Sequence, residues 1–197
     1  MAAAEASPLG AYVVMCLLTG VRTEEARALT WDHVDLDGNA AVDPPIPPYV
    51  AVWRSVRAHG DTKIQRSRRT LQLSERAVRA LREHQVRQAE QRLLAGDLWQ
   101  ASELVFCTSV GSELDASNVR REFRKITKAA GLGEQWAPRE LRTSFVSLMS
   151  GSGVPVEEIA RLAGHSSSRT TEVVYRRELR PVITTGAEVM DKIFSAS

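Results

Sequence analysis

Three side chains that can hold or attack a phosphate follow one another between residues 140 and 179. The stretch ELRTSFVSLMSGSGVPVEEIARLAGHSSSRTTEVVYRREL contains Arg142, His165 and Tyr175. A guanidinium can grip two phosphoryl oxygens, an imidazole can donate to a phosphate or move a proton, and a tyrosine hydroxyl can act as a nucleophile. The same letters also fit a DNA-binding helix-turn-helix, with EEIARLAG as the first helix and RTTEVVY as the recognition helix.

A second group of candidates lies more than a hundred residues upstream. TGVR ends on Arg22, Glu25 follows three residues later, and GDTKIQRSRR contains Lys63. Two guanidiniums on the free oxygens of a phosphodiester would neutralise its charge and hold it for in-line displacement. Taken singly, Arg22 could simply pair with Glu25, Lys63 could be a solvated turn lysine, and His165 could interact with a helix C-terminus.

Tyrosine attack sets its own requirements. A free tyrosine has a pKa of ~10, so Tyr175 needs a cationic setting near neutral pH, and its attack leaves a phosphotyrosine that preserves the bond energy for religation. This chemistry calls for no metal, ATP or other cofactor. The four histidines are scattered singly, which argues against a metal site of the usual spacing.

The elements that must position these side chains are mostly helices. Apolar periodicity, capping residues and Gly or Pro breaks predict helices over 9–19, 23–31, 74–94, 116–130, 138–150 and 155–164, one around Tyr175 and one after Pro181. Ser74 is the expected N-cap of the long helix. YVAVWRSV, RRTLQL and ELVFCT read as short strands, with Lys63 on the tip or edge of a hairpin. The predicted class is α+β, mainly helical with a small antiparallel sheet.

Composition and charge narrow the function. A chain of 197 residues that is 43% hydrophobic and 25% charged is expected to form one domain, or a domain with an appendage. Eleven Lys or Arg face four acids between residues 54 and 92, which indicates a polyanion-binding side, although a solvated helix face would also absorb such charges. The residues expected to bind DNA are Arg66, Arg68, Arg69, Arg176 and Arg177.

The remaining composition points to the cytoplasm. No Lys or Arg precedes Arg22, so the basic region of a signal peptide is missing, and the apolar run 11–18 is too short to span a bilayer. Cys16 and Cys107 lie in apolar runs, where a buried reduced thiol is expected.

These motifs, taken in order, resemble those of the tyrosine recombinases, the phage integrase family. LLTGVRTEEARALTWDHVDLDG is similar to the first signature, GDTKIQRSRRTLQL to the β-hairpin that carries a lysine, and RELRTSF, LAGHSS and TTEVVYRR to the second signature. The resemblance covers about residues 9 to 180 and implies the tyrosine recombinase catalytic-domain fold. It divides the chain into a catalytic domain, 1–180, and a helical tail, 181–197, without the N-terminal DNA-clamping domain of the family.

The resemblance also implies roles for the candidate residues. They are Arg22 and Arg142 as phosphate clamps, Lys63 as general acid, His165 as a phosphate or proton partner, Tyr175 as nucleophile, and Glu25 as the acid that steadies Arg22. The chain departs from the family at Arg139, where a histidine is usual. An arginine can donate to a phosphoryl oxygen but cannot accept a proton, so the base is water, the phosphate or His165.

The function that the resemblance implies is site-specific recombination or integration. Double-stranded DNA would be cleaved and rejoined through a 3′-phosphotyrosyl intermediate by a protein that is monomeric when free and tetrameric on two DNA sites, at the nucleoid of a bacterial cytoplasm and without membrane contact. The tail would pack on its own domain or on a neighbouring protomer. The alternatives are DNA relaxation of the type IB topoisomerase kind and a non-enzymatic helix-turn-helix module.

Overall fold

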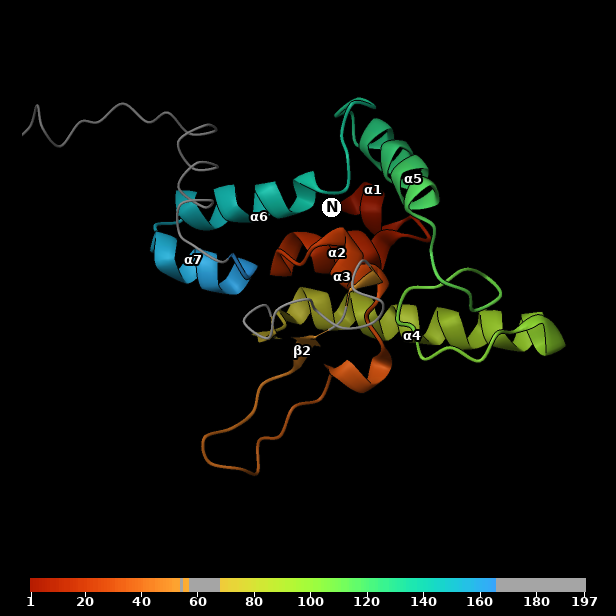
Figure 1. Ribbon diagram of the computed structural model, residues 1–197, viewed down its shortest axis with the longest axis horizontal. Helices are drawn as coiled ribbons and strands as arrows, with labels where there is room; N and C mark the ends of the chain where they lie inside the picture. The colour runs from red at the N-terminus through yellow and green to blue at the C-terminus, as the bar shows by residue number, and fades with distance from the viewer. Residues whose placement is uncertain (54, 57–67, 166–197) are drawn as a thin grey trace, which may run out of the picture.

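The computed structural model describes residues 1–53, 55–56 and 68–165, and they form a group of helices with a small sheet at one edge (Figure 1). The α-helices are α1 (Ala2–Glu5), α2 (Gly10–Thr19), α3 (Thr23–Arg27), α4 (Glu75–Ala95), α5 (Ala116–Ala129), α6 (Glu140–Gly151) and α7 (Val156–Ala163), with 3-10 turns η1 (Trp31–His33) and η4 (Gly96–Leu98). The strands are β1 (Val34–Asp35), β2 (Tyr49–Val52) and β3 (Arg69–Gln72). The expectations for Lys63, Arg66, Tyr175, Arg176, Arg177 and the tail fall outside the described residues.

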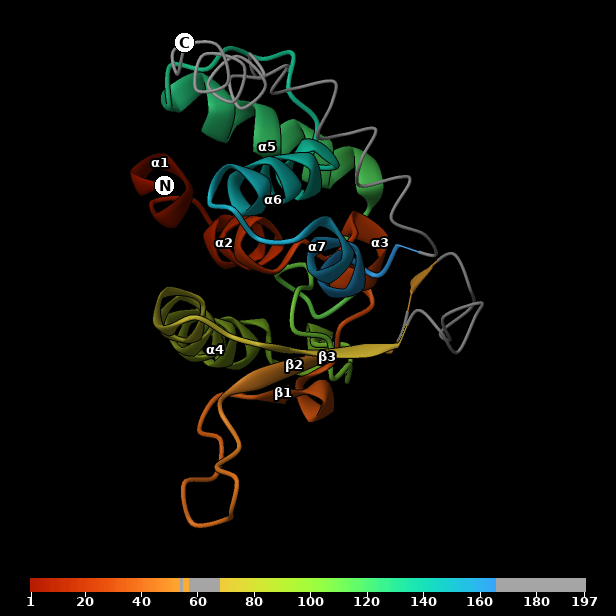
Figure 2. The same cartoon turned by 90° about the vertical axis from the view of Figure 1, so that its left-hand side faces the viewer.

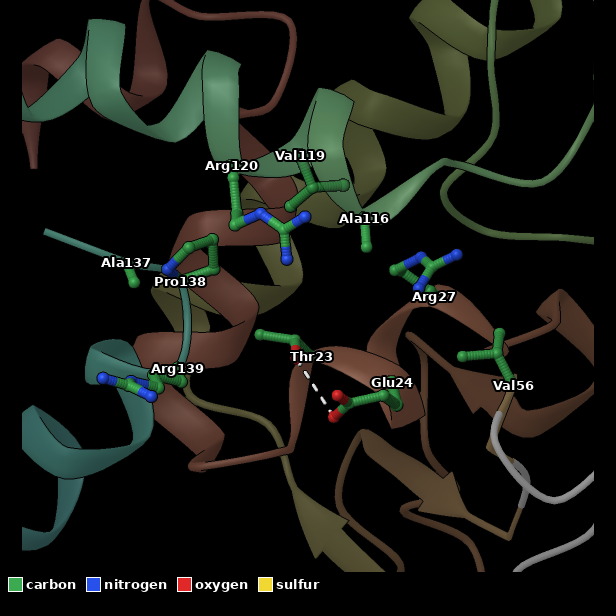
Figure 3. Close-up of a pocket in the computed structure, with 10 residues that line it drawn as sticks. All are labelled: Thr23, Glu24, Arg27, Val56, Ala116, Val119, Arg120, Ala137, Pro138 and Arg139. Atoms are coloured by element: carbon green, nitrogen blue, oxygen red, sulfur yellow. Dashed lines mark hydrogen bonds between the residues drawn. The ribbon is translucent and has the colours of Figure 1, made fainter.

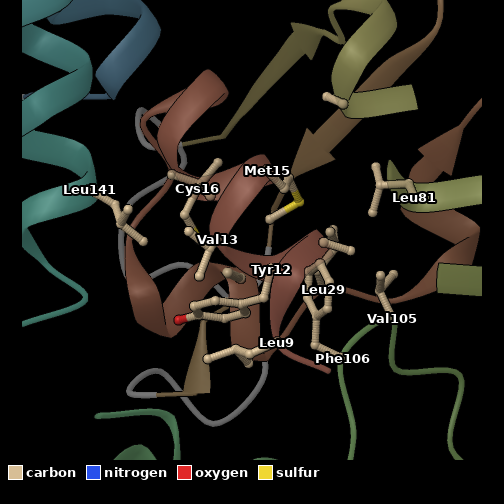
Figure 4. Packing of buried hydrophobic residues seen from close by; sticks show 14 of the residues in the cluster. Leu9, Tyr12, Val13, Met15, Cys16, Leu29, Leu81, Val105, Phe106 and Leu141 are labelled. Carbon is tan, nitrogen blue, oxygen red and sulfur yellow. The ribbon is translucent and has the colours of Figure 1, made fainter. Parts of the chain in front are cut away.

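The core is built around α2, whose sequence is apolar on every side. Helix α2 lies between α6 and α4, and both views show this sandwich (Figures 1 and 2). A helix that is apolar all round has to be buried, and Tyr12, Val14 and Cys16 are at most 1% exposed. The Tyr12 ring meets Phe106 edge to face, with 5.3 Å between centroids (Figure 4). Because α2 cannot move without opening the core, the residues at its C-terminal end have a rigid support.

The sheet has the order β1-β2-β3 and is antiparallel throughout. Val50 in the central strand pairs with Val34 on one side and with Leu71 on the other. Leu71 and Leu73 are buried, whereas Thr70 and Gln72 are exposed, as the two-residue period of a strand requires. The two strands are therefore confirmed, although they are shorter than YVAVWRSV and RRTLQL.

The predicted strand ELVFCT is wrong. Within the described residues this segment makes only single bridges, between Thr30 and Leu104 and between Cys107 and Glu113. Its carbonyls are satisfied by a side chain instead: Gln88 Nε2 donates to the oxygens of Leu104 and Val105, each at 3.0 Å. Cys107 is only half-buried, while Cys16 is fully buried, and both thiols are free.

Helix ends follow local sequence closely in most places. Ser74 Oγ accepts from the backbone N of Ala77 at 3.4 Å, which confirms the predicted N-cap of α4. Helix α7 lies between Pro155 and Gly164, and Gly164 adopts the left-handed φ of 66° that ends a helix. Helix α3 ends at Arg27 rather than at residue 31, because the chain turns there into η1. No helix in the described ranges has the length and apolarity to cross a membrane.

Candidate active site

The described candidates from the two distant motifs meet at one place. Arg22 is the N-cap of α3, Arg142 lies in the first turn of α6, and His165 follows the glycine that ends α7. Glu25 sits among them with its side chain 3% exposed. The fold therefore brings together residues that the sequence separates by more than a hundred positions.

Glu25 is a buried carboxylate with four donors. Its Oε1 accepts from Arg22 Nη1 at 2.8 Å and from Arg69 Nη1 at 3.2 Å. Its Oε2 accepts from the backbone N of Arg22 and from Arg69 Nη2, both at 2.8 Å. Burial alone would raise the pKa of Glu25, but hydrogen bonds and charge from Arg69 and Arg22 more than offset it and hold the pKa below its ordinary value. The carboxylate therefore stays ionised.

Arg22 is held from two sides and keeps one face open. In addition to its contacts with Glu25, its Nη2 donates to the carbonyl oxygen of Gly164 at 2.8 Å. Its side chain is nevertheless 38% exposed. An arginine so oriented presents its remaining N–H groups to a ligand without loss of rotamer freedom on binding.

Arg142 is only partly satisfied. Its Nη1 donates to the carbonyl oxygen of Gly20 at 2.6 Å. Its Nη2 is buried, and none of the described groups accepts a hydrogen bond from it. Burial, then the charges of Arg22 and Arg69, lower the pKa of Arg142 to about 9, so the group is a cation at neutral pH.

The turn that presents the Gly20 carbonyl requires glycine. Gly20 has a φ of 66°, and a Cβ there would stand 2.4 Å from Cδ1 of Phe145. Both the left-handed backbone and the contact with a buried ring exclude a larger side chain. The TGVR motif thus combines a helix end, a carbonyl for Arg142 and the start of Arg22's own turn.

His165 is neutral in this setting. Burial first, and then the charges of Arg142, Arg22 and Arg69, lower its pKa to about 4. Its backbone N donates to the carbonyl oxygen of Ala160 at 2.9 Å, which fixes the residue to the last turn of α7. A neutral imidazole carries one donor and one acceptor nitrogen, so it can both hold a phosphoryl oxygen and take up a proton.

Arg69 was expected to bind DNA, but in the structure its guanidinium is engaged within the protein. Its side chain is 8% exposed and points inward, with Nε on the carbonyl oxygen of Leu162 at 2.9 Å and both Nη atoms on Glu25. The neighbouring Arg68 is exposed. The strand alternation that buries Leu71 and Leu73 places Arg69 on the same face, and this signal was present in RRTLQL.

The basic segment 54–92 is also less uniform than its composition suggested. Arg76 pairs with Glu5 at 2.8 Å, and Arg82 pairs with Asp37 at 2.6 Å. Both pairs lie at the surface, so part of the excess charge is matched by acids from other elements.

Arg139 is the N-cap residue of α6, three residues before Arg142. It is exposed, and it lines a pocket together with Thr23, Glu24 and Arg120 (Figure 3). In the close-up it sits beside Pro138, at the rim of the pocket. Within the described ranges, no group of three or more His, Cys, Asp or Glu side chains is placed to hold a metal ion.

Comparison with known proteins places the chain in a family. The model of the phage integrase family matches residues 1–180. An integrase of Streptomyces ambofaciens is 59% identical over 98% of this chain and 50% of its own length. A tyrosine recombinase XerC-like protein of Caldanaerobacter subterraneus is 25% identical over 94% of this chain and 50% of its own. The chain thus spans about half the length of these curated relatives.

Solved structures agree on the fold. The XerA recombinase superimposes with a TM-score of 0.69 at 23% identity, over 97% of this chain and 60% of that one. The XerH recombinase bound to palindromic difH gives 0.66 at 19% identity, over 92% and 45%. The predicted α+β class and catalytic-domain fold are confirmed. With its signatures in order and its arginines gathered around one carboxylate, the chain belongs to the phage integrase family of tyrosine recombinases.

Proposed function

We propose that this chain is the catalytic domain of a site-specific DNA recombinase or integrase that cleaves and rejoins strands through a phosphotyrosine at Tyr175. The observation that carries the proposal is the buried Nη2 of Arg142, for which the described part of the chain offers no acceptor. A buried donor without a partner is costly, and a phosphoryl oxygen would satisfy it. Arg22 and Arg69 share the Glu25 carboxylate, and Arg142 adds a third positive charge close to them, so the site suits an anion.

Each described residue has a distinct task in this proposal. Arg142 and the open face of Arg22 hold the two free oxygens of the scissile phosphate and stabilise the charge of the transition state. The neutral imidazole of His165 donates to an oxygen or accepts a proton. Glu25 keeps Arg22 in place and does not itself touch the phosphate.

In the proposed covalent step, the scissile phosphate is transferred from the DNA strand to Tyr175. The Tyr175 hydroxyl loses its proton, its oxygen forms a bond to phosphorus, and the bond to the 5′ oxygen of the next nucleotide breaks. Lys63 is proposed to protonate that leaving oxygen, and the reverse reaction rejoins the strand. Arg139 cannot accept the tyrosine proton, which leaves His165, water or the phosphate as acceptor.

The proposed partner is double-stranded DNA. XerH bound to difH and a lambda integrase dimer bound to a COC′ core site are among the similar structures. We propose that the chain acts on DNA in the bacterial cytoplasm, at the nucleoid, as a homotetramer on two sites and as a monomer when free. Residues 1–180 form the catalytic unit in this proposal, and 181–197 form the tail.

The helix-turn-helix alternative is less well supported. Its first helix would be α7, but the carbonyls of Leu162 and Gly164 at the end of α7 accept from Arg69 and Arg22. The end of this helix is therefore committed to the arginine cluster. No contact among the described residues favours DNA relaxation of the topoisomerase kind over recombination.

The test is to capture covalent adducts. The protein is incubated with a library of nicked duplexes in the presence of a chelator, and SDS-stable adducts are recovered, sequenced and mapped by mass spectrometry. We expect a 3′-phosphotyrosyl adduct at Tyr175 that is absent from Tyr175→Phe. An adduct at another residue, or one that persists in the variant, would falsify the assignment.

The same samples separate the alternatives. Tight binding of one sequence without any adduct would favour the helix-turn-helix module. Relaxation of a supercoiled plasmid without strand exchange would favour the topoisomerase.

A further inference from the structure

We infer that Arg69 is a positioning residue for this reaction: its guanidinium joins Glu25 to the end of α7 and thereby fixes the orientation of Arg22. The inference rests on the proposed function, and it gives a task to a residue that the sequence had suggested for DNA contact. It follows from three hydrogen bonds of Arg69, from the different exposures of Arg69 and Arg22, and from the packing of Gly164.

The contacts of Arg69 span three segments of the chain. The residue begins β3, its Nη atoms reach Glu25 in α3, and its Nε donates to the carbonyl oxygen of Leu162 in α7 at 2.9 Å. A planar fork can make these bonds in two directions at once, which a lysine cannot. Arg69 therefore acts as a cross-link between strand, helix start and helix end.

Exposure distinguishes the two arginines on Glu25. The Arg69 side chain is 8% exposed, whereas that of Arg22 is 38% exposed. A guanidinium covered to this extent cannot follow a DNA backbone, while its neighbour can. The two residues therefore differ in role: Arg22 meets the substrate, and Arg69 supports it from behind.

Glu25 transmits the effect of Arg69. With Arg69 in place, both carboxylate oxygens take two donors each. Without Arg69, the buried carboxylate keeps only the backbone N and Nη1 of Arg22 as donors. The pKa of Glu25 should then rise, because Arg69 contributes the largest of the interactions that lower this pKa against the effect of burial. Among the described residues, Arg142 and the buried thiol of Cys16 also interact with Glu25 electrostatically.

Gly164 shows how closely the parts fit. Its carbonyl oxygen accepts from Arg22, and a Cβ on it would stand 2.7 Å from Arg69 Nη1. The end of α7 is thus packed against both arginines, and His165 is the next residue. Displacing Arg69 would loosen the imidazole as well as Arg22.

The experiment compares Arg69→Gln and Arg69→Lys with the native chain and with Arg76→Gln, a matched surface arginine that pairs with Glu5. The Glu25 carboxyl is titrated by carbon-13 NMR, adduct formation is timed on a nicked duplex recovered from the library, and affinity is measured on a short mixed-sequence duplex. For Arg69→Gln we expect a raised Glu25 pKa and adduct formation slower by ~10- to 100-fold, because a misplaced clamp loses catalytic geometry. Affinity should change far less, and Arg76→Gln should match the native chain.

The pH dependence separates positioning from general loss of structure. In Arg69→Gln the rate should fall further as pH is lowered, since protonated Glu25 releases Arg22. Glu25→Gln should be slow at every pH. Arg69→Lys should keep the charge and still be slow.

Three results would overturn the inference. An unchanged Glu25 pKa in Arg69→Gln would overturn it, whether or not the native chain forms adducts. If the native chain forms no adducts, that result counts against the proposed function and not against the role of Arg69. Affinity that falls in step with the rate would mean a direct DNA contact. Full recovery by Arg69→Lys would mean that charge alone matters.

Discussion

Arg22 Nη2 donates a hydrogen bond of 2.8 Å to the carbonyl oxygen of Gly164, a residue 142 positions further along the chain. The bond joins the TGVR motif directly to the LAGH motif. The carbonyl belongs to the glycine that caps α7, so the negative end of that helix faces a cation. The two motifs are therefore halves of one structural unit, and each orients the other.

Replacing Arg142 should raise the stability of the fold and lower the activity. Replacing it with methionine removes a buried cation whose Nη2 lacks an acceptor in the described part of the chain, and the free energy of unfolding should rise by about 1 kcal/mol. Adduct formation should fall by ~10² to 10³ or more, as when an oxyanion donor is lost. Urea unfolding and adduct kinetics measure the two effects. A variant that is both less stable and still active would contradict this account.

His165 should make stability depend on acid pH. Its folded pKa of about 4 lies below its ordinary value of 6.5, so the unfolded chain binds the proton more tightly. The stability is complete above pH 6.5 and is lost as pH falls from 6.5 toward 4. His165→Gln should remove this part of the pH dependence, measured as the urea midpoint against pH. Parallel curves for both proteins would show that His165 is not shielded.

Gly164→Ala should cost both stability and activity. The left-handed φ of 66° penalises any side chain by about 1 to 2 kcal/mol, and the new Cβ would also push Arg69. Gly153→Ala is the matched control, because Gly153 has a φ of 80° with nothing within 4 Å of its Cβ position. The control should lose similar stability in urea unfolding and keep its adduct rate. Equal rates for both variants would disconnect Gly164 from the arginines.

Arg139→His should be tolerated, because it restores the residue that is usual in the family at the start of α6. It also adds a group that titrates, so the rate profile should gain a step near pH ~6.5. Arg139→Gln is the control without a titrating group. The measurement is the rate of adduct formation between about pH 5 and about pH 8. If Arg139→His were as inactive as Arg142→Ala, Arg139 would itself be a phosphate clamp.

Salt dependence should separate the basic residues. If exposed Arg68 contacts a phosphate, Arg68→Gln should lower the log–log slope of affinity against salt by ~0.9. Arg76→Gln should leave the slope unchanged, since that guanidinium is engaged with Glu5. Fluorescence anisotropy with a mixed-sequence duplex measures both. A change at Arg76 and none at Arg68 would reverse the assignment.

Much of the fold could be predicted because its signals are local. Ser74 is the N-cap of α4, and α7 begins after Pro155 and ends at Gly164. The prediction of a strand over ELVFCT was wrong because the carbonyls of this segment do not pair with another strand. They accept hydrogen bonds from the Gln88 side chain of α4 instead, and no pattern in a single sequence indicates such a contact.

The site was predictable in part. The residues around Arg22, Arg142 and His165 could be proposed from motif spacing, but the inward orientation of Arg69 depends on which face of β3 is buried. The alternation with Leu71 and Leu73 contained that information, whereas the basic run RSRR favoured the opposite interpretation. A charged residue on the buried face of a strand needs a buried counter-charge, and Glu25 was the available one.

The arginine cluster also dictates when the site can form. Its contacts close loops of 44, 93, 122 and 142 residues, from Glu25 to Arg69, Arg69 to Leu162, Gly20 to Arg142 and Arg22 to Gly164. Long loops close late in folding, because their entropy is repaid only after the intervening elements have docked. A nascent chain can bury α2 against α4 while α7 is still in the ribosome, and it then has a core without the arginine cluster. The proposed phosphate-binding site therefore forms as one of the last events of folding.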